Sequence, residues 1–200
     1  MKDDKIVSKI KEFTLKNSEL DDTHGFKHVE RVYNLSLLIG KKLNANLIVL
    51  KIAALLHDVG RIYEEKGNQN RNHAEISAQK ALDYLISNDF KISQKDIDNV
   101  IHSIKAHSFS NNIVPKTLEA KILSDADKLD AIGAIGLYRT ISFTTKNKGG
   151  INEVIEHLER KIIKLKDEMY LEISKELAKE RHKIVVNFYD EIKKETRLKS

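Results

Sequence analysis

The sequence predicts an all-α protein, and three observations support that prediction. Apolar residues recur at helical spacing from one end of the 200-residue chain to the other. No stretch alternates apolar and polar residues for long enough to predict a strand. One proline and eight glycines leave little room for the turns that a sheet needs. Because no linker divides the chain, we expect one helical domain over residues 1–200.

The composition narrows the chemistry that the chain can perform. The absence of cysteine excludes disulfides, thiolate zinc sites and cysteine nucleophiles, so any metal needs nitrogen and oxygen ligands. Neither a signal-peptide core nor a membrane-spanning apolar run is present, which predicts a soluble, cytoplasmic protein without a membrane partner. The net charge of +5 favours anionic partners such as nucleotides. A nucleic-acid partner is not favoured, because lysines and arginines do not cluster with aromatic residues.

Apolar residues at helical spacing define three helices in the first third of the chain, with faces at Ile6–Phe13, Val29–Ile39 and Leu47–Leu56. Start signals at residues 21–23 precede the second of them. The third is apolar on most sides, so we expect it to be largely buried and to end before Gly60.

Further along, start signals mark two more helices. Residues 64–71 are polar and aperiodic and predict a loop. Asn72 can cap a helix that begins at His73. Ser93 and the acid three residues later resemble a capping box, which opens a helix that runs toward His107.

The last part of the chain also has helical spacing. Pro115 suits the first turn of a helix that continues to Leu129. Residues 141–150 are the most loop-like stretch, and residues 151–195 predict two long helices. Long helices of this kind are compatible with a homodimer.

The doublet His57-Asp58 stands at the end of the buried helix, where little water can reach it. Polar groups in such a place need a hydrogen bond, a counter-charge or a metal. A bound cation would satisfy both side chains at once. Taken alone, however, the doublet favours a satisfied core histidine beside a polar helix end.

Other polar residues are also expected at buried positions or lie near helix starts. His28 and Arg31 lie side by side on one helix. Asp127 lies among small and aliphatic residues, so its carboxylate needs a partner. His102 and His107 are five residues apart and cannot both point the same way along a regular helix.

Taken together, three segments resemble the ordered signature of the HD-domain metal-dependent phosphohydrolases: HVERV at 28–32, LLHDVGR at 55–61 and DADKLD at 125–130. The segments HAEISA at 73–78 and AHSFS at 106–110 are similar to small bacterial and archaeal members. The resemblance covers about residues 23–138. It implies a helical bundle of the HD-domain type, with a motif-bearing core over that range and the helices of 151–195 packed on it.

The resemblance also implies a set of metal ligands. The first histidine of the signature is His28, and the doublet is His57 and Asp58. The distal aspartate is Asp127, because the family places this ligand in an Ala-Asp-x-Leu context. Two imidazoles and two carboxylates suit Mn²⁺, Fe²⁺, Co²⁺, Ni²⁺ or Zn²⁺ better than Mg²⁺.

Roles in the reaction follow from the same resemblance. Asp58 would hold the metal and accept a hydrogen bond from the attacking water. Arg31 and Lys128 would supply positive charge for phosphate or, alternatively, simply pair with neighbouring acids. A second metal or the substrate phosphate would contact further histidines, namely His73, His107 and, behind them, His102.

The sequence therefore predicts an enzyme that hydrolyses a phosphate ester or phosphoanhydride, most plausibly in a nucleotide, with a metal-activated water. Phosphatase, phosphodiesterase and nucleotide pyrophosphohydrolase activities all fit. A non-catalytic regulatory module that binds metal or nucleotide is the alternative. A helical nucleic-acid binder is motivated by the net charge alone.

Overall fold

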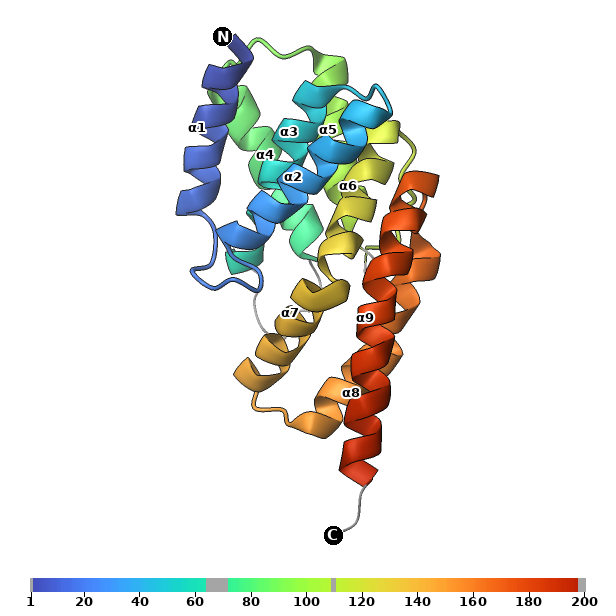
Figure 1. The fold of residues 1–200 in the computed structure, drawn as a ribbon. Helices are drawn as coiled ribbons and strands as arrows, with labels where there is room; N and C mark the ends of the chain where they lie inside the picture. The colour runs from blue at the N-terminus through green and yellow to red at the C-terminus, as the bar shows by residue number, and fades with distance from the viewer. Residues whose placement is uncertain (1, 64–71, 109–110, 198–200) are drawn as a thin grey trace. The chain divides into compact units, whose positions relative to one another are not determined.

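The computed structural model describes residues 2–63, 72–108 and 111–197 (Figure 1). Over these ranges the chain forms α-helices and short 3₁₀ helices without a strand, which confirms the predicted all-α class. The backbone groups into two compact units, residues 1–126 and 127–200. A single domain over residues 1–200 stays a prediction. Among the described residues, no helix has both the length and the apolar character needed to cross a membrane.

The first unit is built around its third helix. α3 packs against α1, α2, α4 and α5, and seven of its ten residues are buried. This central position explains why its sequence is apolar on most sides. The helices are α1 (Lys2–Lys16), α2 (Phe26–Lys42), α3 (Leu47–Leu56), η1 (Arg61–Tyr63), α4 (His73–Ser87), α5 (Gln94–His107) and α6 (Leu118–Asp130), whose last residues lie past the unit boundary.

Side-chain contacts tie α1 to both α4 and α3. The rings of Phe13 on α1 and Tyr84 on α4 stack with centroids 3.9 Å apart. The Thr14 hydroxyl lies 3.0 Å from the carbonyl oxygen of Leu55 and donates to it, which ties α1 to the last turn of α3. This end of α3 is where the His57-Asp58 doublet begins.

The predicted helix starts are confirmed at two places. The Asn72 side chain accepts the N–H of Ala74, and the Ser93 hydroxyl accepts the N–H of Asp96. The predicted loop at 64–71 lies outside the described residues. The prediction for Pro115 was wrong, because α6 begins at Leu118.

The reason is a cap that lies after the proline. The Thr117 hydroxyl accepts the N–H of Ala120 at 3.1 Å, and its carbonyl oxygen accepts the N–H of Lys121. Thr117 therefore satisfies the first free amides of the helix, and Pro115 belongs to the segment that leads to this cap.

The second unit corrects two expectations. Its elements are α7 (Gly133–Lys146), α8 (Ile151–Arg160), η3 (Ile162–Glu168) and α9 (Glu172–Arg197). The predicted loop at 141–150 is helical as far as Lys146, because Thr140 and Thr144 are buried and continue the inner face of α7. The predicted two long helices over 151–195 are one short helix, a 3₁₀ segment and one long helix. Ile162, Leu165 and Met169 are all buried, so the apolar spacing continues through the break and conceals it.

Candidate metal centre

The first histidine of the doublet is oriented by its own helix. His57 follows α3 directly and is fully buried. Its Nδ1 lies 2.8 Å from the carbonyl oxygen of Ala54. A carbonyl can only accept, so Nδ1 carries the proton and Nε2 presents a lone pair. This is how proteins usually fix the tautomer of a histidine that binds a metal.

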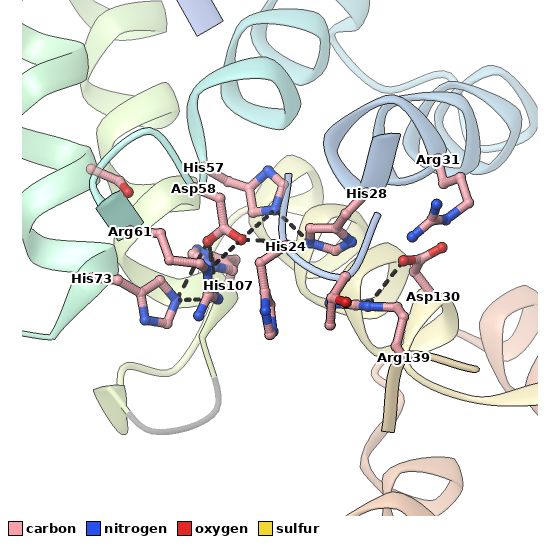
Figure 2. A network of polar contacts seen from close by, with 12 residues as sticks. His24, His28, Arg31, His57, Asp58, Arg61, His73, His107, Asp130 and Arg139 are labelled. Carbon is pink, nitrogen blue, oxygen red and sulfur yellow. Dashed lines mark hydrogen bonds and ion pairs between the residues drawn. The ribbon is translucent and has the colours of Figure 1, made fainter. Parts of the chain in front are cut away.

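A second imidazole and a carboxylate meet that lone pair (Figure 2). His28 on α2 places its Nε2 3.3 Å from Nε2 of His57. Asp58 Oδ2 lies 3.6 Å from the Nε2 atom of His28 and 3.7 Å from that of His57. All three side chains are buried. Two ligands bound about 2.1 Å from one ion are roughly 3 to 4 Å apart, so these three atoms fit a shared cation.

The other oxygen of Asp58 faces a second pair of histidines. Asp58 Oδ1 lies 3.5 Å from His73 Nε2 and 3.6 Å from His107 Nε2. His107 ends α5, and its Nδ1 lies 2.6 Å from the carbonyl oxygen of Ile104. The His107 ring is thus held as the His57 ring is, with Nε2 directed to the carboxylate. The histidines and Asp58 thus form two triads, His28–His57–Asp58 and Asp58–His73–His107. Within each triad, the ligand atoms all lie within 4.8 Å of one another.

Asp58 is ionised despite its burial. Burial raises the pKa of its carboxyl, but the Arg61 guanidinium and the His57 imidazole lower that pKa more. The neighbouring His107 and His73 lower it further, so the pKa of Asp58 lies well below its ordinary value. A carboxylate rather than a carboxylic acid therefore stands between the two histidine pairs, as a metal ligand must.

A close approach of two backbones brings the doublet to the start of α4. The Gly60 N–H donates to the Ser77 hydroxyl at 2.9 Å. A Cβ atom at Gly60 would lie 2.4 Å from the backbone nitrogen of Ser77 and 2.8 Å from the carbonyl oxygen of His73. Because only a glycine fits here, the chain can place His73 beside Asp58.

Five of the predicted residues come together in this centre: His28, His57, Asp58, His73 and His107. The structure places His102 elsewhere. Its Nε2 accepts the N–H of Lys116 at 2.9 Å, so this ring supports the segment before α6. The expectation that His102 and His107 point in different directions agrees with this arrangement.

The remaining predicted residues have other contacts. Arg31 donates to the carbonyl oxygen of Asp22 at 3.2 Å. Lys128 lies in the second unit, with its Nζ 4.7 Å from the ring centroid of Tyr170. Asp127 is the first residue of that unit, and its role as a metal ligand stays a prediction.

Sequence reasoning overlooked Arg61 as a residue of the site. Its Nε donates to Asp58 Oδ2 at 2.8 Å, and its Nη2 lies 3.3 Å from Asp58 Oδ1. The same Nη2 lies 3.2 Å from His73 Nε2. A basic residue three positions after a buried acid was the available signal, because that spacing brings side chains together on a helical turn.

Comparisons with known proteins show which families and structures the chain is similar to. The model of the HD domain family matches residues 25–132. The Bacillus subtilis protein YpgQ is 32% identical over 180 residues, which are 86% of this chain and 84% of that protein. A crystal structure of B. subtilis YpgQ in complex with ADP superposes with a TM-score of 0.78 at 28% identity, covering 98% of this chain and 97% of that one. Ribonuclease Y of Thermoanaerobacter pseudethanolicus is 34% identical over 105 residues, which are 52% of this chain and 18% of that enzyme.

Proposed function

The chain belongs to the HD-domain superfamily of metal-dependent phosphohydrolases, and we propose that it hydrolyses a phosphate ester or phosphoanhydride bond of a nucleotide. The observation that supports this most directly is the ionised Asp58 carboxylate between two pairs of buried histidines. Such a set of nitrogen and oxygen donors is costly to bury without a cation.

In this proposal His28, His57 and Asp58 hold the principal metal, with Asp127 as their fourth ligand. The family match covers all four residues. The donor set suits Mn²⁺, Fe²⁺, Co²⁺, Ni²⁺ or Zn²⁺ better than Mg²⁺. When bound, such an ion lowers the pKa of a water ligand toward neutrality and neutralises charge that develops on phosphorus.

The chain's own residues position the reacting groups. Asp58 is the group that we assign to accept a hydrogen bond from the attacking water, since its carboxyl is ionised. Arg31 and Lys128 are assigned to supply positive charge toward the phosphate. The positive charges of the two side chains and their positions within the matched residues 25–132 support this assignment.

The second histidine pair is proposed to hold a second cation. His73 and His107 approach Asp58 Oδ1, whereas His28 and His57 approach Oδ2. Asp58 belongs to both triads, so it would help to hold either cation. If one ion alone binds, the same two rings would contact a substrate phosphate instead, and each would first have to gain a proton on Nε2 to donate to it.

Two similarities support a nucleotide as the substrate. The relative YpgQ has been crystallised with ADP. Ribonuclease Y, by its name an enzyme that acts on RNA, is 34% identical to this chain over 105 residues. The net charge of +5 also favours a polyanionic substrate.

A screen of nucleoside mono-, di- and triphosphates with Mn²⁺ or Co²⁺ tests the proposal. Chromatography of the products shows whether phosphate or pyrophosphate leaves. We expect turnover by the wild-type protein and its loss in Asp58→Ala. Asp167→Ala, at an exposed acid in η3, is the matched control and should retain turnover. A wild-type protein that binds the metal but hydrolyses no nucleotide would instead support the regulatory module.

A further inference from the structure

We propose that Arg61 and a second divalent cation exclude each other beside Asp58 and His73, so that Arg61 must move before the second cation binds. This inference rests on the proposed function, because it assigns a role to the second histidine pair. Arg61 is here a positioning residue that controls how many ions the centre holds.

The guanidinium already contacts the atoms that a second cation would need. Its Nη2 lies 3.3 Å from Asp58 Oδ1 and 3.2 Å from His73 Nε2. These two acceptor atoms are themselves 3.5 Å apart. They belong to the triad of Asp58, His73 and His107, which has metal-ligand spacing.

His73 makes the two occupants incompatible. An arginine nitrogen can only donate, so the Nε2 atom of His73 accepts with its single lone pair. A metal ion would bind the same lone pair.

The first triad does not meet this conflict. Arg61 Nε donates to Asp58 Oδ2 at 2.8 Å, but a carboxylate oxygen has more than one lone pair and can also bind a metal. The Nε2 atoms of His28 and His57 each face Oδ2. The exclusion therefore applies to the second ion and spares the first.

Arg61 has the features of a side chain that can leave. It lies in the short 3₁₀ segment η1, and its side chain is 23% exposed, whereas that of Asp58 is 2% exposed. If a divalent cation replaced the guanidinium, the buried negative charge of Asp58 would still have a positive partner. The displaced guanidinium would then be able to pair with a phosphate oxygen.

Calorimetric titration of metal-free protein with Mn²⁺ alone tests this competition. We expect the wild-type protein to bind one Mn²⁺ tightly and a second one more weakly. Arg61→Gln should tighten the second step on the order of tenfold and leave the first nearly unchanged, because removal of the competitor makes the site always available. Electron paramagnetic resonance should show spin-coupled Mn²⁺ pairs at lower Mn²⁺ concentration in Arg61→Gln than in the wild type.

Two further variants keep the test decisive. Arg160→Gln removes an arginine whose side chain is 78% exposed in the second unit, and it should titrate like the wild type. Arg61→Lys keeps the charge without the planar group, and its second step should fall between those of the wild type and Arg61→Gln. A second step that is unchanged or weaker in Arg61→Gln, with the first step intact, overturns this inference alone. Failure of the wild type to bind any Mn²⁺ overturns both this inference and the proposed function.

Discussion

At the residue scale, the same kind of hydrogen bond orients two histidines of the centre. His57 and His107 each give an Nδ1–H to the carbonyl oxygen three residues earlier in the chain, at Ala54 and Ile104. Each ring is thereby turned so that Nε2 faces Asp58. His102 has the same side chain but accepts an N–H through Nε2. Orientation, rather than residue type, thus separates a candidate ligand from a structural histidine.

This distinction predicts the effect of removing either kind of histidine. His57→Ala should weaken Mn²⁺ binding by more than about a hundredfold, because the first triad loses a ligand whose tautomer is already fixed. Elemental analysis after gel filtration measures the bound metal. His102→Gln should retain the wild-type metal content. Stoichiometric metal in His57→Ala would show that this triad is not the principal site.

The ionisation of Asp58 predicts a pH dependence of stability in the metal-free protein. Its folded-state pKa is lowered well below the ordinary value. The stability that this shift contributes is present above the unfolded-state pKa of about 3.9 and is lost as the pH falls through the folded-state pKa. Between about pH 5 and pH 2, Asp58→Asn should therefore lose less free energy of unfolding than the wild type. Urea unfolding in the presence of a chelator measures this, and parallel curves for the two proteins would refute it.

At the scale of elements, the contact between the end of α3 and the start of α4 positions half of the centre. Gly60 lies so close to the backbone of Ser77 that a methyl group cannot be accommodated without a shift of α4. Since His73 is the first residue of α4, such a shift would move it relative to Asp58.

Gly60→Ala is therefore expected to reduce the free energy of unfolding by roughly 2 to 3 kcal/mol. It should also weaken the second Mn²⁺ more than the first, because α4 carries His73 and none of the first triad. Chemical denaturation and Mn²⁺ titration provide the two measurements.

The matched control is Gly150→Ala, where the nearest atom to the new methyl group would be a flexible Glu153 oxygen at 3.5 Å. That change should cost no more than about 1 kcal/mol, the usual penalty for alanine at a helix N-cap. Equal losses in the two glycine variants would mean that the close approach at Gly60 is not what positions α4.

The elements themselves were largely predictable, because caps and apolar spacing are local signals. Asn72 and Ser93 mark helix starts in the sequence and in the structure. The failures arose where local signals misled. Residues 141–146 include a serine, two threonines and a lysine, yet Thr144 is buried on α7 and the helix continues. The break after η3 at Met169 was concealed because buried apolar residues lie on both sides of it.

At the scale of the whole molecule, a metal that binds the folded chain but not the unfolded chain must stabilise the folded state. At about a hundred times its dissociation constant, Mn²⁺ should add about 2.7 kcal/mol to the free energy of unfolding. For a chain of this size that is a rise in Tm of roughly 5 to 10 °C.

Thermal unfolding with Mn²⁺ and with a chelator tests this rise, with His57→Ala as the control. The variant should show little of the increase. An equal rise in both proteins would indicate that Mn²⁺ acts elsewhere on the surface.

The sequence by itself determined the helical class, the burial of α3, most helix starts and the ordered motifs at His28, His57-Asp58 and Asp127. The first three properties depend on neighbours in the chain, so spacing and residue type reveal them, whereas the motifs were identified by their resemblance to a known family. Only the tertiary structure decided that His28 joins His57 at one oxygen of Asp58, while His73 and His107 share the other. It also placed Arg61 against both Asp58 and His73. Such pairings depend on how separate helices pack and on how each ring is oriented. Neither can be predicted from the spacing of residues along the chain.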